Sequence, residues 1–264
     1  MGGNEDRSAR RAPKSSSRGG DSRRGQSGRD SVRRTPISRS GEGRRTEEKP
    51  PTVHLDDEIV KELRATTRPG KAEILIKVFA EAAGAFATDD YVEAIRLGEQ
   101  AKHIALRSGT VRELLGLAYY RIEQWKESAR ELAAFRRLSG STEQNPVIAD
   151  CYRAMGKPEK AVEICEEIDP RKVEPAVAFE GAIVAASALA EMKRLDDAID
   201  KLEKLDLRPA SAEEHHLRAW YVLGDLLERK GRFTQAREWF QAVNGAGPEF
   251  TDAGERLAHL GKRG

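Results

Sequence analysis

The stretch AWYVLGDLLERKGRFTQAREWF, residues 219–240, decides how the chain folds. Side chains spaced at i, i+3, i+4 and i+7 form one face of a first helix: Trp220, Leu223, Gly224 and Leu227. Helical spacing resumes in a second set: Phe233, Ala236 and Phe240. Gly231 stands between the two sets, where a left-handed backbone allows a helix to end. The stretch therefore predicts two antiparallel helices, and Ser211 followed by Glu214 predicts a capping box at the start of the first.

The second helix of this pair has counterparts upstream. It contains a small residue, Ala236, and small residues also stand at four corresponding positions toward the N-terminus. Each is separated from the previous one by 38, 37, 33 and 34 residues in turn: Ala198, Ala161, Ser128 and Ala94. Small residues let one helix approach its partner closely, while larger side chains fill the space on either side. One helix pair cannot bury its own apolar face, so the sequence predicts a stack of such pairs.

A period near 34 residues built of helix–turn–helix units is the signature of tetratricopeptide repeats. The last unit resembles this family in both helices, and the second unit keeps the small and aromatic positions Gly116 and Tyr119. The resemblance covers about residues 70–248. It implies an all-α solenoid of about five helix pairs, at residues 72–107, 110–140, 143–170, 175–209 and 213–248. The chain is also similar to small bacterial repeat proteins that carry a basic arm and have no assigned activity.

The composition divides the chain in two. The first fifty residues hold only five apolar side chains, and their 14 Lys/Arg and 7 Asp/Glu give a net charge of +7. Since the whole chain carries +2, the remainder carries −5. We expect a disordered, basic, Ser/Gly/Arg-rich arm at residues 1–52, because so few apolar groups cannot offset the entropy of ordering the backbone. We expect the solenoid at residues 53–264, with a leading helix at 57–66 and a closing helix at 251–260.

No apolar stretch predicts a signal peptide or a membrane span, and two cysteines do not make a disulfide scaffold. A cytoplasmic protein without membrane attachment is expected. Cys151 and Cys165 are expected to be buried thiols rather than metal ligands. His215 and His216 are adjacent on a helix, so their side chains should diverge by about 100° and cannot share a metal in the i, i+4 manner. We therefore expect no enzyme activity, no metal and no cofactor.

The resemblance implies that the first helix of each pair lines a concave groove that holds a segment of a protein partner. Transferred by position, the candidate groove residues are Glu113, Tyr120, Arg121, Asp150, Arg153, Arg218, Tyr221, Asp225 and Glu228. Aromatic and arginine side chains are typical of binding hot spots. The alternative is that these are the charges of any solvated helix face. The Lys/Asn set with which some relatives hold a peptide carboxylate is not evident.

The arm supports a second hypothesis, in which its arginines bind the phosphates of RNA or DNA while the repeats recruit a protein. Paired arginines would make these contacts: Arg10, Arg11, Arg23, Arg24, Arg33, Arg34, Arg44 and Arg45. No aromatic residue lies among them to stack on bases, and acidic residues dilute their charge. The alternative is that the arm only keeps the protein in solution.

Overall fold

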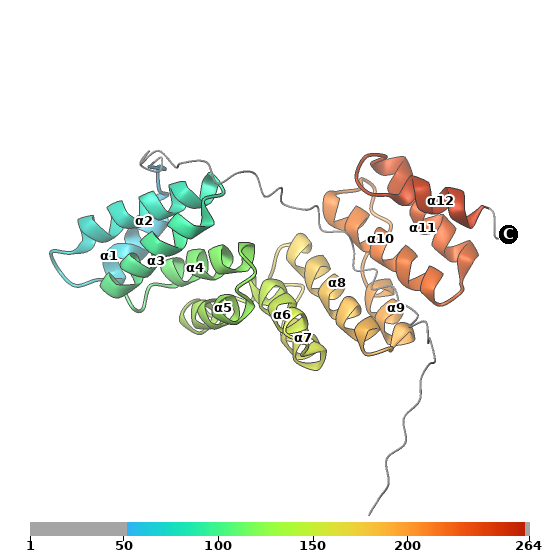
Figure 1. Cartoon of the computed structure of the whole chain (residues 1–264), viewed down its shortest axis with the longest axis horizontal. Helices are drawn as coiled ribbons and strands as arrows, with labels where there is room; N and C mark the ends of the chain where they lie inside the picture. The colour runs from blue at the N-terminus through green and yellow to red at the C-terminus, as the bar shows by residue number, and fades with distance from the viewer. Residues whose placement is uncertain (1–51, 262–264) are drawn as a thin grey trace, which may run out of the picture. The chain divides into compact units, whose positions relative to one another are not determined.

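A computed structural model describes residues 52–261 of the chain. This part of the chain forms twelve helices and no strand (Figure 1). The helices are α1 (Asp57–Thr66), α2 (Ala72–Ala87), α3 (Tyr91–Ile104), α4 (Gly109–Arg121), α5 (Trp125–Ser139), α6 (Asn145–Ala154), α7 (Pro158–Glu166), α8 (Pro175–Glu191), α9 (Leu195–Glu203), α10 (Glu214–Arg229), α11 (Phe233–Ala246) and α12 (Ala253–Leu260). The predictions made for the basic arm fall on residues 1–51, outside the described part.

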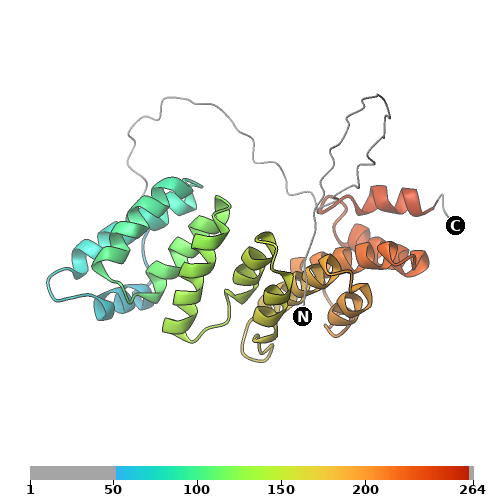
Figure 2. The ribbon, with the colours of Figure 1, turned by 60° about the horizontal axis from the view of Figure 1, so that its bottom comes forward.

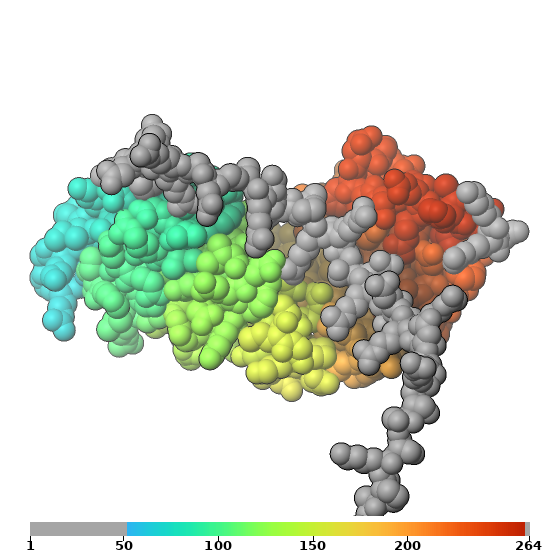
Figure 3. Space-filling view, viewed as in Figure 1, coloured from blue at the N-terminus to red at the C-terminus, as the bar shows by residue number. Residues whose placement is uncertain are grey.

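Ten of these helices form five consecutive pairs: α2–α3, α4–α5, α6–α7, α8–α9 and α10–α11. The two helices of each pair contact each other, and each pair contacts the next along the chain. The ribbon in Figure 2 shows the pairs following one another in chain order. The blue-to-yellow surfaces in Figure 3 touch in the same order. The predicted all-α solenoid of about five helix pairs is therefore confirmed.

Each pair turns through one residue with a left-handed backbone. The five residues are Asp89 (φ 59°), Glu123 (φ 64°), Gly156 (φ 71°), Lys193 (φ 63°) and Gly231 (φ 80°). Each lies five positions before the small residue of its second helix. In the last turn the backbone N–H of Arg232 donates to the carbonyl of Leu227 at 2.9 Å, the six-to-one bond of a Schellman motif. The predicted break in 219–240 is confirmed, with the first helix ending at Arg229 and the second beginning at Phe233.

The predicted capping box at Ser211 and Glu214 is wrong. Helix α10 begins at Glu214 itself, and Glu213 is the N-cap residue. The backbone N–H of Glu213 donates to Nδ1 of His216 at 3.1 Å. The imidazole therefore takes the place of the expected glutamate side chain, and it can accept this hydrogen bond only in its neutral form.

The core is built where small residues of one helix receive large residues of another. A Cβ atom added at Gly116 would lie 2.4 Å from Cγ of Leu132, and one added at Gly224 would lie 2.9 Å from Cε1 of Phe240. The repeat-packing residues named from the sequence are all buried: Ala94, Gly116, Tyr119, Ser128, Ala161, Ala198, Trp220, Leu223, Gly224, Leu227, Ala236 and Phe240. A methyl group does not fit at these distances, so glycine at positions 116 and 224 allows the two helices of each of these pairs to approach closely.

A buried carboxylate joins the first two pairs. Glu131 of α5 is 1% exposed and accepts from Nη1 of Arg112 at 2.6 Å and from Arg130 at 2.9 Å. Lys102 of α3 lies 3.3 Å away. Burial raises the pKa of Glu131, but the hydrogen bonds from Arg112 and Arg130, together with the charges of Lys102 and Arg112, outweigh it and leave the pKa below its usual value. The carboxylate is therefore held ionised between α3, α4 and α5.

Helices α1 and α12 cover the two ends of the described array. The carboxylate of Glu62 in α1 accepts from the backbone N–H of Gly109 at 2.7 Å and from the Ser108 hydroxyl at 2.9 Å. These two donors lie at the N-terminus of α4, which a negative charge stabilises. At the other end α12 packs on α11. No helix within residues 52–261 is long and apolar enough to cross a membrane.

Candidate partner-binding face

The nine candidate groove residues lie on the first helices α4, α6 and α10. We call them the candidate face: Glu113, Tyr120, Arg121, Asp150, Arg153, Arg218, Tyr221, Asp225 and Glu228. Every one of them is bonded to a side chain of a neighbouring repeat or of the closing segment 251–260. The face is therefore a series of polar links between successive units, and the sequence pattern did not reveal those partners.

Two hydrogen bonds join the second unit to the third. The Tyr120 hydroxyl donates to Oδ2 of Asp150 at 2.6 Å, and Nε2 of Gln144 donates to Oε1 of Glu113 at 2.8 Å. Asp150 is only 7% exposed. Burial raises the pKa of Glu113, because removing a carboxylate from water disfavours its charged form. The link between these two units is thus made by acids that are largely withdrawn from water.

Arg121 links the second unit back to the first. Its guanidinium donates to the hydroxyl of Tyr91 at 2.5 and 2.9 Å and lies 5.0 Å from the centre of the tyrosine ring. Asp89 lies 3.5 Å from the same guanidinium and also accepts from the Tyr91 hydroxyl. The Arg121 side chain remains 54% exposed, so this link stands at the water-accessible edge of the face.

Arginines also link the third, fourth and fifth units. Arg153 donates to Asp150 on its own helix at 2.5 Å and to Glu191 of α8 at 2.7 Å. Arg218 of α10 donates to Glu180 of α8 at 2.8 Å. Burial raises the pKa of Glu180, and the charge of Arg218 opposes this shift only in part. The fourth unit, which contributed no candidate residue from the sequence, thus supplies two carboxylates to the face.

The last unit is covered by the closing helix. Arg256 of α12 donates to Asp225 at 2.9 Å and to Glu228 at 2.7 Å. The Tyr221 hydroxyl donates to Asp252 at 2.6 Å. Burial and then this hydrogen bond raise the pKa of Tyr221 to about 12. Tyr221, Asp225 and Glu228 are therefore already bonded to side chains of the closing segment, which the sequence pattern did not predict. The signal was a complementary side chain 31 positions downstream of Tyr221 and of Asp225, close to the repeat period.

The candidate face and the side chains paired with it carry more acid than base. The carboxylates are Asp89, Glu113, Asp150, Glu180, Glu191, Asp225, Glu228 and Asp252, and the guanidiniums are Arg121, Arg153, Arg218, Arg229 and Arg256. Eight carboxylates against five arginines leave a net negative charge along the face. Such a field attracts positively charged partners and repels phosphate.

The residues considered for catalysis or metal binding lie in the interior. Cys151 and Cys165 are buried and unpaired, and burial raises the pKa of these thiols to about 11 and about 12. Protonated thiols are poor nucleophiles and poor metal ligands. The rings of His215 and His216 have centroids 4.0 Å apart, and both pack against the ring of Phe179. Among the described residues no three His, Cys, Asp or Glu side chains gather where they could hold a metal ion.

Comparison with known proteins agrees with this architecture. Residues 217–246, which span most of α10 and α11, match the family model described as tetratricopeptide repeat. The last helix pair is therefore a tetratricopeptide repeat, and the chain has the solenoid fold of tetratricopeptide repeat proteins. The comparison with curated proteins gave no match.

Solved structures share the fold, among them the following two. One is YrrB, described as a TPR protein with an unusual peptide-binding site, with a TM-score of 0.52 and 16% identity over 78% of this chain and 97% of YrrB. The other is TTC0263, described as a thermophilic TPR protein in Thermus thermophilus, with a TM-score of 0.52 and 15% identity over 70% of this chain and 98% of that one. At these identities the likeness establishes the fold and nothing about a ligand.

Proposed function

We propose that the solenoid is a non-catalytic interaction module that holds a segment of a protein partner along the candidate face, as an adaptor or assembly component. One observation carries this proposal: side chains from all five units, together with α12, are joined from each unit to the next by ion pairs and hydrogen bonds whose charged members are net acidic. Arginine and tyrosine side chains in such pairs can exchange an internal partner for one on a ligand. The fold, shared with a peptide-binding relative, supports the same proposal.

The charge of the face also defines the partner. A segment with a net positive charge would be drawn to it, and the excess of carboxylates would repel an acidic one. The hypothesis that the chain binds nucleic acid depends on arm residues outside the described part, and the repeat region with its net charge of −5 does not favour phosphate. We place the protein in the cytoplasm, a proposal that rests on its two unpaired cysteines.

A photocrosslinking amino acid placed in turn at two matched positions tests the proposal. Arg218 belongs to the candidate face, and Lys160 lies on the second helix α7, and the two side chains are equally exposed at 47%. Irradiation in native extract should attach a discrete partner at position 218 and not at position 160. Equal labelling at both positions, or labelling at 160 alone, would place the interaction outside the candidate face.

A further inference from the structure

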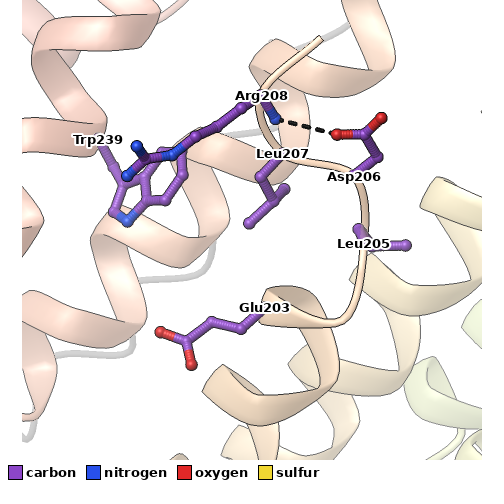
Figure 4. A pocket seen from close by; sticks show the side chains of 6 residues that line it. All are labelled: Glu203, Leu205, Asp206, Leu207, Arg208 and Trp239. Atoms are coloured by element: carbon purple, nitrogen blue, oxygen red, sulfur yellow. Dashed lines mark hydrogen bonds between the residues drawn. The ribbon is translucent and has the colours of Figure 1, made fainter.

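A pocket of about 340 Å³ lies outside the candidate face (Figure 4). It is formed by the end of α9, the segment that leads to α10, and the middle of α11. Its lining residues are Glu203, Leu205, Asp206, Leu207, Arg208 and Trp239. The pocket thus belongs to second helices and a connecting segment, whereas the candidate face belongs to first helices.

The charges around this pocket are not neutralised within the described part of the chain. Glu203, Asp206 and Arg208 form no ion pair with any other residue of 52–261. Asp206 accepts only the backbone N–H of Arg208, at 3.4 Å. On the candidate face, by contrast, every charged residue already has an ionic or hydrogen-bonding partner. A ligand at the pocket would therefore gain charge contacts without first breaking internal ones.

The apolar part of the pocket is held in place by the core. Leu207 is 8% exposed, and its carbonyl accepts from Nε1 of Trp220 at 2.9 Å. Trp239 is half-buried, and its ring centroid lies 6.3 Å from that of Trp220. Figure 4 shows the Arg208 side chain extending toward Trp239, with Glu203 below the pocket and Asp206 at its far side. Because the Trp239 side chain is already held in place, a ligand that packs on it would immobilise little further and lose little entropy on binding. Such tryptophans are characteristic of binding hot spots.

We propose that this pocket binds a protein segment in which a lysine or arginine stands next to an aliphatic side chain. Two carboxylates against one guanidinium give the rim a net negative charge, and Glu203, which Figure 4 draws on the Trp239 side of the connecting segment, would receive the cation. The aliphatic side chain would pack on Trp239, where it removes apolar surface from water. This site is separate from the candidate face and does not depend on it.

The test uses the indole N–H signals of the full chain, which has three tryptophans, with the Trp239 signal assigned through Trp239→Phe. The probe is a blocked peptide, GKLKLKG, and its comparison peptides are GELELEG and GKSKSKG. The lysine–leucine peptide should shift the Trp239 signal saturably, and both comparison peptides should bind at least about fivefold more weakly. That factor corresponds to one partly exposed ion pair or one packed aliphatic side chain.

Matched variants locate the effect. Glu203 ends α9 and Glu166 ends α7, and both are exposed. Glu203→Lys should weaken binding about fivefold, whereas Glu166→Lys should leave it unchanged. An unmoved Trp239 signal, equal binding of the glutamate peptide, or equal weakening by Glu203→Lys and Glu166→Lys would each overturn the proposal.

Discussion

Replacing Gly116 by alanine tests whether close contact between helices holds the repeats together. The added Cβ would lie 2.4 and 2.5 Å from Cγ and Cδ2 of Leu132 and 3.1 Å from its backbone nitrogen. Leu132 is fully buried, so it cannot move aside into water. Overpacking of this kind costs about 1–3 kcal/mol, while alanine regains about 1 kcal/mol of helix propensity. Together these give a net loss of up to about 2 kcal/mol, and we expect about 1 kcal/mol.

Gly245 of α11 provides the matched control, because nothing lies within 4 Å of a Cβ added there. Gly245→Ala should stabilise the protein by about 0.5–1 kcal/mol, from helix propensity alone. Urea unfolding of both variants and the parent protein, followed by circular dichroism at 222 nm, gives the comparison. If Gly116→Ala unfolds at the same or a higher urea concentration than the parent, the argument from close helix approach is wrong.

Three further predictions concern the turns, the α10 cap and the buried carboxylate. Gly231→Ala should lower stability by about 1 kcal/mol and Lys193→Gly should raise it by up to about 1 kcal/mol, because both positions have left-handed backbones that only glycine adopts without strain; equal effects on thermal unfolding would contradict this. Burial and then the neighbouring His215 charge lower the pKa of His216 below its ordinary value of 6.5. The contribution of neutral His216 to the free energy of unfolding should therefore be fully present above pH 6.5 and should be lost as the pH drops through the folded-state pKa. A thermal midpoint that falls equally between pH 7.5 and 5.5 in His216→Asn would contradict this. Glu131→Gln should cost about 2–3 kcal/mol in urea unfolding, because it leaves the largely buried guanidinium of Arg112 without its counter-charge, whereas Lys102 keeps Glu99; a loss below about 0.5 kcal/mol would show that water compensates Arg112.

Helix periodicity and one recurring small residue were enough to predict the pairs. The backbone conformation of the turns could be predicted only in part. Glycine marks the left-handed residue at Gly156 and Gly231, but Asp89, Glu123 and Lys193 occupy the same conformation without any compositional sign. The Schellman hydrogen bonds and the packing around each turn impose that backbone regardless of the residue.

The polar contacts were harder to predict than the packing. The sequence placed Arg218 and Tyr221 on one face, yet it did not show that Glu180 and Asp252 bind them. Those contacts depend on how adjacent units are rotated, and one sequence does not specify that rotation. The pocket beside Trp239 was missed for a similar reason, since its lining comes from a segment without periodicity.

The contacts of Arg256 have a consequence for changing the length of the protein. Arg218 reaches back from the fifth unit to the fourth, and Arg256 reaches back from α12 to the fifth. Helix α12 thus supplies the interface of a following unit without its second helix. A duplicated module of about 34 residues grafted between α11 and α12, ending in the surface of α10, would offer Arg256 the same carboxylates. Protein engineers could therefore lengthen the array and keep α12 as the helix that covers its last unit.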